Sequence, residues 1–251
     1  MLATLLAGIT KSAQFPFSPW LPIAIAAPTP VSALVHSSTL VTAGVYLLIR
    51  LSPTLFQIQW FAPTLLIIRT LTILIAALTA ILETDIKKIV AYSTLRQLGV
   101  MMAALGLNSP YLALFHLLTH AIFKALLFIC VGSYIHYHQH SQDLRTVGNL
   151  NTHIPLTQAA TTISNLALIG TPFLAAFYSK DPIIELTKTS PTNFIISFLF
   201  LFSTALTAAY TARATYISQL GINLQPPLLN IHNTSILFTL PTATLALAAV
   251  V

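Results

Sequence analysis

The chain has 251 residues, of which 56% are hydrophobic and only 6% charged, and its formal net charge is +6. So few charges cannot cover the surface of a soluble domain of this size, which excludes a soluble globular protein. The 11 basic residues are dispersed along the chain, so no nucleic-acid-binding patch is expected. The single cysteine, Cys130, lies in an apolar run, which excludes a disulfide framework and a thiolate metal site.

Lipid offers no hydrogen-bond partners to an open backbone, so the long apolar stretches predict transmembrane helices. We therefore expect an all-α fold, a polytopic transmembrane helix bundle in which two helices are broken. On this interpretation residues 1–251 form a single membrane domain.

The first segment, residues 1–27, begins as an apolar helix that carries Lys11. Pro16, Pro19 and Pro22 follow it closely. Proline removes a backbone donor and clashes with the preceding turn, so a continuous helix is not expected here. We predict a broken helix with Lys11 beside the break, because broken membrane helices are tolerated where they line a polar cavity. The alternative is an amphipathic segment that lies on the membrane surface.

The second span is predicted over residues 31–49 and carries His36 in a polar cluster. Taken alone, His36 fits a core histidine that is bonded to a neighbouring serine. Arg50 is expected to close this span by reaching toward the interface. The third span is predicted over residues 64–82, and its Arg69 is expected to reach the interface in the same way.

Residues 83–88 are the densest charge cluster of the chain. They predict a short hydrophilic turn whose acids cap the next helix. That helix is expected over residues 86–107, and it carries the unexpected Arg96.

The most informative stretch lies in an apolar run from Tyr111 to about Tyr134. His116, His120 and Lys124 have the spacing i, i+4, i+8, so they share one helical face, with about 6 Å between neighbours. Titratable groups at membrane depth are costly unless they face water or polar partners, and they are usually functional. We interpret them as part of a proton path. The alternative is three separately bonded side chains that hold helices together.

Three histidines, His136, His138 and His140, follow this span. Their spacing could hold a metal ion from an extended loop, but no carboxylate or cysteine completes the set, so no metal site is expected.

Residues 155–189 predict a fifth span that is interrupted by Gly170, Thr171 and Pro172. Lys180 and Asp181 follow the interruption and are adjacent, so they point roughly 100° apart and do not simply neutralise each other. The alternative is a solvated pair at the membrane interface.

Residues 193–216 and 236–251 predict the last two spans. On this count Lys87, Lys88 and Arg145 fall on one side of the membrane. The positive-inside rule assigns that side to the cytoplasm or the matrix.

Several short motifs occur in a characteristic order and spacing. They are KSAQ at 11–14, WLP at 20–22, APTPVSAL at 27–34, HSST at 36–39, DIKK at 85–88, AYST at 91–94, HLLTHAIFKALL at 116–127 and FYSKD at 177–181. The sequence closely resembles the chain 5 family of mitochondrial NADH-ubiquinone oxidoreductase, the distal antiporter-like subunits of respiratory complex I. The resemblance covers nearly all of the chain and is least distinct after about Ser218.

The resemblance implies a central hydrophilic axis along which protons move. The residues that match it are Lys11, His36, His116, His120, Lys124, Lys180 and Asp181. It also implies that the two broken helices are related by an inverted repeat. No catalytic, cofactor-binding or metal-binding residues are expected in this chain, since NADH, FMN, iron-sulfur clusters and ubiquinone would belong to other subunits of the complex.

Two departures from the family pattern stand out. Complete members have additional amino-terminal helices, with a glutamate that pairs with the equivalent of Lys11, and a long lateral helix at the carboxyl end. We therefore expect an internal fragment or one half of a split subunit, starting near the seventh helix. Arg96 stands where the resemblance leads us to expect a small polar residue.

The function implied is proton translocation coupled to remote quinone reduction, by a multi-pass subunit of the mitochondrial inner membrane. The chain would belong to a translocase without performing redox chemistry itself. Its partners would be the lipid bilayer and other membrane subunits of complex I, especially the neighbouring antiporter-like subunit, and no nucleic acid. The alternatives are a cation/proton antiporter subunit of the homologous family and a helical receptor or scaffold with incidental polar residues.

Overall fold

The computed structural model of the protein describes residues 2–138, 141–190, 194–221 and 236–250. The helices of the first half are α1 (Leu2–Lys11), α2 (Trp20–Ala24), α3 (Thr29–Val31), the π-helical segment η1 (Ser32–Thr39), α4 (Leu40–Leu55), α5 (Phe61–Leu82) and α6 (Ile86–Gly106). Those of the second half are α7 (Pro110–Tyr137), α8 (Leu150–His153), α9 (Pro155–Ile169), α10 (Ala175–Thr189), α11 (Phe194–Leu220) and α12 (Ile236–Val250). Within these ranges the regular elements are all helices, which confirms the predicted all-α class.

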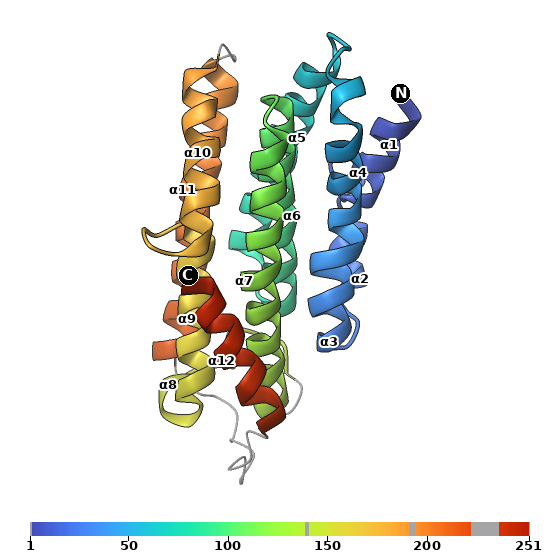
Figure 1. Cartoon of the computed structure of the whole chain (residues 1–251). Helices are drawn as coiled ribbons and strands as arrows, with labels where there is room; N and C mark the ends of the chain where they lie inside the picture. The colour runs from blue at the N-terminus through green and yellow to red at the C-terminus, as the bar shows by residue number, and fades with distance from the viewer. Residues whose placement is uncertain (1, 139–140, 191–193, 222–235, 251) are drawn as a thin grey trace.

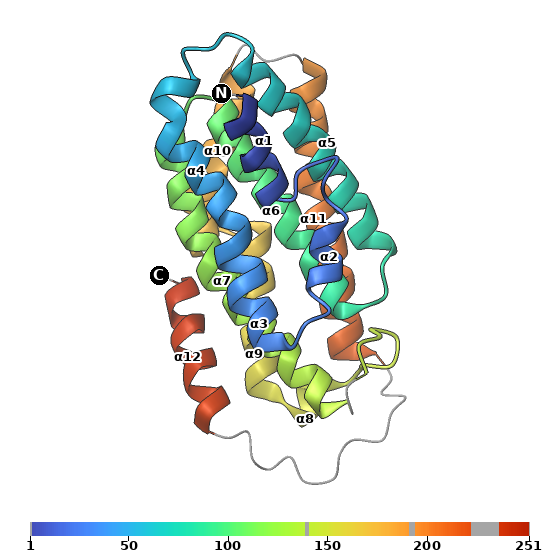
Figure 2. The same ribbon diagram turned by 90° about the vertical axis from the view of Figure 1, so that its right-hand side faces the viewer.

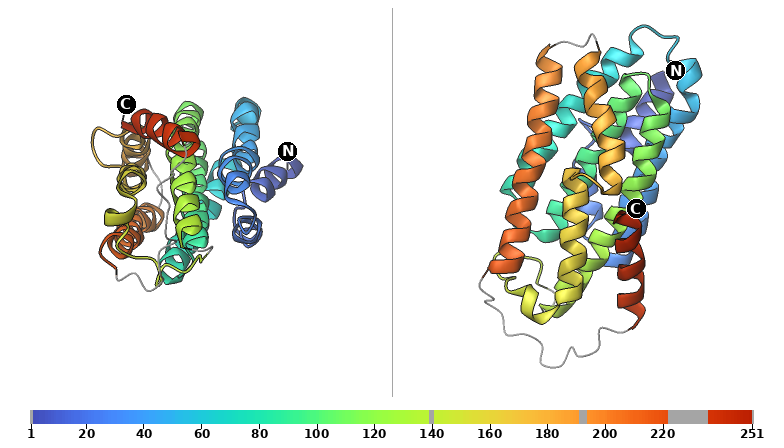
Figure 3. Two further views of the ribbon diagram at one scale, coloured as in Figure 1. Left: turned by 90° about the horizontal axis from the view of Figure 1, so that it is seen from below. Right: turned by 60° about the vertical axis from the view of Figure 1, so that its left-hand side comes forward.

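The longer helices run side by side and form a bundle (Figure 1). Seen from below, α5, α6 and α7 lie between α1–α4 on one side and α9–α11 on the other (Figure 3). Among the described residues, five helical stretches are long and apolar enough to cross a membrane, which confirms the polytopic class. They are Thr29–Leu55, Phe61–Leu82, Ile86–Gly106, Pro110–Tyr137 and Phe194–Leu220.

The second span is longer than predicted, because the helix does not end at Arg50. Segments α3, η1 and α4 follow one another directly and reach Leu55. Pro53 lies inside α4, where its missing N–H leaves the carbonyl of Ile49 without the usual partner. The hydroxyl of Ser52 donates to that carbonyl at 2.7 Å, which explains how the helix continues past the proline.

Non-helical segments separate shorter helices at both positions where breaks were predicted. Residues 12–19 connect α1 to α2 (Figure 2), and residues 170–174 connect α9 to α10. The first connection is anchored to α5, because the hydroxyl of Thr72 donates to the buried side chain of Gln14 at 2.8 Å. Whether each pair of helices spans the membrane as one broken helix stays a prediction.

The loops before α6 and after α7 meet at one end of the bundle. The backbone N–H of Leu144 donates to the carbonyl of Thr84 at 2.9 Å. Lys87 and Lys88 at the start of α6 and Arg145 of the later loop therefore lie at the same end of the bundle, as predicted. Asp85 is the N-cap residue of α6, as the prediction of an acidic cap requires. However, its side chain makes no capping hydrogen bond and pairs with Lys88, one turn further on, at 2.8 Å.

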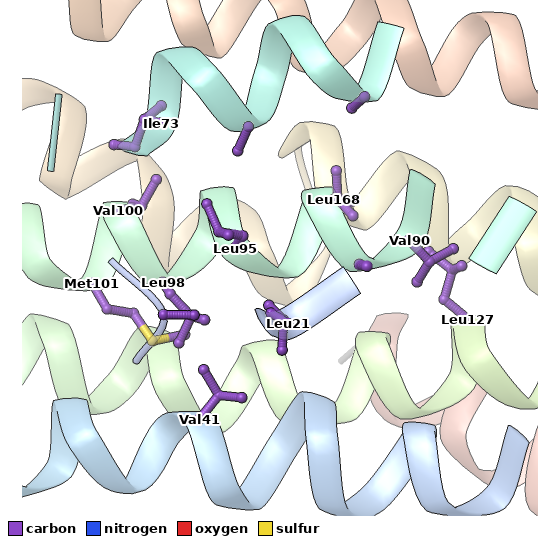
Figure 4. Packing of buried hydrophobic residues seen from close by; sticks show 14 of the residues in the cluster. Leu21, Val41, Ile73, Val90, Leu95, Leu98, Val100, Met101, Leu127 and Leu168 are labelled. Carbon is purple, nitrogen blue, oxygen red and sulfur yellow. The ribbon is translucent and has the colours of Figure 1, made fainter. Parts of the chain in front are cut away.

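Helix α6 is the centre of the core, and almost all of its residues are buried. Figure 4 shows Leu95 and Leu98 of this helix among apolar side chains from its neighbours. A helix enclosed on all sides cannot direct polar side chains to water. The polar residues Ser93, Arg96 and Gln97 of α6 must therefore find their partners inside the protein.

Helices α1 and α4 approach each other closely at two glycines. A Cβ atom on Gly44 would lie 2.7 Å from the backbone oxygen of Gly8 and 3.0 Å from the backbone nitrogen of Ser12. Small residues permit this approach of helix backbones in membranes. The contact fixes the end of α1, where Lys11 lies.

We expect Gly44→Ala to destabilise the bundle by about 1–3 kcal/mol, because the atoms it would meet are backbone atoms that cannot rotate aside. The measurement is the thermal stability of the chain in its native membrane. Ala43→Ser, at the exposed neighbouring position, is the matched control. An unchanged melting temperature for Gly44→Ala would contradict the close contact between α1 and α4.

Candidate functional site

Three residues of the central helix α7 are enclosed by the bundle. His116, His120 and Lys124 each have a relative exposure of 0%. Helix α7 packs against α6, α9 and α10, and these helices cover the face of α7 that carries the three residues. Ionisable groups in this setting are costly without polar partners, and the partners therefore define what the site can do.

His116 lies within hydrogen-bond distance of a partner at both ring nitrogens. Its Nδ1 lies 2.9 Å from Oγ of Ser179 on α10, and its Nε2 lies 3.2 Å from Oε1 of Gln97 on α6. The amide nitrogen of Gln97 donates to the carbonyl of Leu168 at 3.4 Å, so its oxygen is left to accept from His116. A neutral His116 thus carries its proton on Nε2 and can accept at Nδ1 from the Ser179 hydroxyl.

Lys180 is held at the carbonyl end of α9. Its Nζ donates to the carbonyls of Ile169 at 2.6 Å and of Leu168 at 3.5 Å. The last carbonyls of a helix have no partner within the helix and attract cations. Gly170 ends the helix with φ +92°, and a Cβ atom there would lie 3.3 Å from Cδ of Lys180. Glycine therefore permits both the left-handed turn and the passage of the lysine.

Lys124 and His120 continue the row along α7. Lys124 donates to the hydroxyl of Ser93 on α6. The ring centroid of His120 lies 6.4 Å from that of His116, and neither ring nitrogen of His120 has a hydrogen-bond partner among the described residues. His120 thus lies between Lys124 and His116, and both of its ring nitrogens are without a hydrogen-bond partner among the described residues.

Arg96 lies in the same region of α6 and is fully buried. None of its guanidinium nitrogens has a hydrogen-bond partner among the described residues, although the Tyr210 hydroxyl of α11 is nearby. Arg96 lies between Ser93 and Gln97 of α6, which contact Lys124 and His116. A buried cation thus lies on the helix that supplies the partners of two predicted path residues.

The expectation for Arg69 is wrong. This side chain does not reach the interface but is fully buried, and its guanidinium carbon lies 5.1 Å from the ring centroid of Phe200 on α11. Helix α11 packs against α5 and covers this position, so the cation stacks on the aromatic ring instead.

The remaining predicted path residues do not join the enclosed cluster. Lys11 is exposed in the last turn of α1, whereas His36 in η1 and Asp181 in α10 are half-buried. The resemblance places Lys11 and His36 on one axis with the α7 residues, but the described helices do not enclose them. The reason is that α1 packs chiefly against α4, which leaves the other side of Lys11 uncovered. Their roles in proton transfer stay predictions.

A cavity of about 50 Å³ adjoins the cluster and has room for water molecules. Its lining includes Ser93, the acceptor for Lys124, and Leu144 from the loop at the end of the bundle. Polar groups between them include Tyr134 and Thr161, whose hydroxyls lie 2.7 Å apart. The cavity therefore lies between Lys124 and one end of the bundle.

Sequence reasoning missed two residues that connect the cluster, Gln97 and Ser179. Gln97 lies one turn after Ser93 and directly after Arg96 in the polar part of α6, and this spacing is the only local signal it carries. Ser179 adjoins Lys180, but nothing in the sequence shows that it faces α7. Its contact with His116 follows only from the packing of α10 on α7.

No group of three His, Cys, Asp or Glu side chains in the described part of the chain is arranged to hold a metal ion. His138, one of the three histidines considered for that role, is buried at the end of α7, and its burial together with His153 lowers its pKa. His140 lies outside the described residues.

A multi-pass helix bundle with a row of enclosed lysine and histidine side chains is typical of ion-translocating membrane proteins. The sequence profile of the NADH:quinone oxidoreductase/Mrp antiporter transmembrane family matches residues 1–207. The chain therefore belongs to this family.

The relatives agree with this assignment. The chain is 52% identical over 250 residues to NADH-ubiquinone oxidoreductase chain 5 of Lumbricus terrestris, covering 100% of this chain and 43% of that protein. It is 57% identical over 217 residues to the protein of the same name from Anopheles gambiae, covering 86% and 37%. The chain thus spans about two-fifths of the length of these relatives.

A solved structure supports the fold as well. A chain in the structure of the Mrp complex from Dietzia sp. DQ12-45-1b is similar, with a TM-score of 0.86 and 31% sequence identity. The match covers 99% of this chain and 27% of that chain.

The burial pattern predicts how the lysines react in native membranes. We expect an amine-reactive reagent to label the exposed Lys188 at least about tenfold faster than Lys124 or Lys180, because enclosed groups react only after local opening. Quantitative mass spectrometry of labelled peptides measures the rates. Equal rates at the three lysines would contradict the enclosed site.

Proposed function

We propose that this chain is a proton-translocating membrane subunit of respiratory NADH:ubiquinone oxidoreductase in the mitochondrial inner membrane. The observation that carries the proposal is the enclosed polar row on α7, which is connected to Lys180 through Gln97 and the carbonyl of Leu168. The names of the relatives support the enzyme to which the subunit belongs.

The residues of the row suit proton transfer. Lysine and histidine side chains bind and release protons, and a buried charge strongly affects its neighbours because the surrounding dielectric is low. Lys124 takes up a proton on the side of the cavity, and His120 and His116 pass it along α7. Lys180 receives it at the carbonyl end of α9. Each transfer moves one proton and leaves the total charge unchanged.

The rest of the axis rests on the resemblance alone. Lys11 and His36 would carry protons on the α1–α4 side, and Asp181 would act next to Lys180. NADH, FMN, iron-sulfur clusters and ubiquinone would be bound by other subunits, and quinone chemistry would drive transfer from a distance. The partners would be other membrane subunits of the complex, the neighbouring antiporter-like subunit above all, together with the lipid bilayer.

Cation/proton antiport is the second candidate, and the similarity to a chain of the Mrp complex favours it. Sodium uptake by proteoliposomes separates the two. Sodium transport that depends on Lys124 and Lys180 would support antiport, whereas proton transport without sodium dependence supports the first proposal.

We expect Lys124→Ala and Lys180→Ala each to lower NADH-driven proton pumping per electron by at least about tenfold, because each removes a proton-binding group from the row. Pumping is measured in proteoliposomes that contain the complete complex and is normalised to the amount assembled. Lys188→Ala is the matched control, since this lysine of α10 is exposed and its loss is expected to have no effect. Wild-type pumping in both variants would refute the proposal and leave a structural role for the row.

Lys180→Arg tests whether the charge or the proton matters. Arginine keeps its proton under all relevant conditions and cannot release it to the next group. We therefore expect this variant to pump as poorly as Lys180→Ala in the same assay, although the positive charge beside Ile169 is retained. Normal pumping by Lys180→Arg would show that only a fixed charge is needed at this position.

A further inference from the structure

Arg96 lies between the two points at which α6 contacts the polar row. Ser93, Arg96 and Gln97 are spaced i, i+3 and i+4, so they share one face of α6. Ser93 accepts the hydrogen bond from Lys124. Gln97 contacts His116 and donates to Leu168, whose carbonyl also accepts from Lys180. Arg96 thus lies on the face of α6 that contacts Lys124 at Ser93 and, through Gln97, the carbonyl that Lys180 uses.

No carboxylate of this chain neutralises Arg96. All five acidic residues are at least partly exposed, whereas Arg96 has a relative exposure of 0%. Within the described residues the one acid-base ion pair is between Lys88 and Asp85, at the end of the bundle. Arginine keeps its charge in proteins, so a positive charge is permanently present in this low-dielectric region. Each further proton bound nearby adds to the repulsion.

The two lysines differ in how well they can hold a proton against that charge. Lys180 donates to two carbonyls at the end of α9, where the helix dipole favours a cation. Lys124 donates to one neutral hydroxyl, that of Ser93. A single proton shared by the pair is therefore more stable on Lys180.

We propose that Arg96 is a positioning residue that limits Lys124 and Lys180 together to one proton at a time. This inference rests on the proposed function. The proton that Lys124 receives is driven to Lys180 because the carbonyl site there compensates the charge of Arg96 better. Lys124 is then neutral and can accept the next proton. Without Arg96 both lysines can be protonated together, and neither of them is then neutral and able to accept another proton.

The other ionisable groups near Arg96 come from three helices packed around α6. They are His116 and Lys124 from α7, Lys180 from α10 and Tyr210 from α11, and His120 follows between the two α7 groups. The carboxylates of these helices are Asp181 and Glu185 of α10, of which Asp181 is half-buried and Glu185 exposed. A change at Arg96 therefore alters the proton occupancy of this group as a whole.

The test is the pH dependence of NADH-driven proton pumping per electron, measured with the complete complex in proteoliposomes. Arg96→Ser and Arg96→Gln both remove the charge, and Gln keeps a polar side chain for Tyr210. We expect the pumping optimum of both variants to move to higher pH by about one unit, because the lysines release the second proton only under more alkaline conditions. Arg96→Lys, which restores a positive charge, is expected to keep an optimum close to that of the wild type.

Arg69→Gln is the matched control. It removes another fully buried arginine, but one that stacks on Phe200, and the optimum should stay unchanged. An unshifted optimum in Arg96→Ser and Arg96→Gln would overturn the inference, as would failure of both to assemble, which would assign Arg96 a structural role. Failure of the proposed function is distinct, since Lys124→Ala and Lys180→Ala would then pump normally.

Discussion

The central constraint on this structure is the burial of cationic side chains in a bundle that encloses no carboxylate. Arg96, Lys124 and Lys180 are covered by helices, while every acidic residue of the chain is at least partly exposed. Burying a charge costs several kcal/mol unless other groups compensate it. For the two lysines the compensation comes from dipoles, namely the Ser93 hydroxyl and the carbonyls that end α9, whereas the Arg96 guanidinium has no hydrogen-bond partner among the described residues. Dipoles hold a proton less firmly than an ion pair does, which suits groups that must release it.

The interruption between α9 and α10 provides the stronger of these dipole sites. A continuous helix would have used the carbonyl of Ile169 for its own hydrogen bonds. The left-handed Gly170 ends α9, and Lys180 of the following helix reaches back to the freed carbonyls. Lys11 has a related position, because it lies in the last turn of α1, directly before the non-helical segment 12–19. In both cases a lysine lies at the carbonyl end of a short helix.

Helix α6 is the element that makes the cluster possible. It is surrounded by other helices on almost every side, so its polar residues face protein rather than lipid. Ser93 and Gln97 therefore contact Lys124 and His116 of α7, while Arg96 is brought close to Tyr210 of α11. The enclosed side chains lie between α6, α7, α9 and α10, whereas Lys11 on α1 remains at the surface of the chain.

The sequence by itself determined the fold class, most helix positions and the common face of His116, His120 and Lys124. These follow from local rules, since apolar length predicts a membrane helix and a spacing of four residues places side chains on one face. Local rules also indicated the interruption at Gly170. They failed at Pro53, where a hydroxyl replaces the lost backbone donor and the helix continues.

Only the tertiary structure decided which neighbours each polar group meets. The sequence suggested that Arg69 reaches the interface, but α11 covers it and provides Phe200. Gln97 and Ser179 carry no strong signal of their own, yet they connect His116 to α9 and α10. Contacts between helices depend on how whole faces pack, and the residues involved are far apart in the sequence. Periodicity therefore predicts the face on which a side chain lies, but not the group that it contacts there.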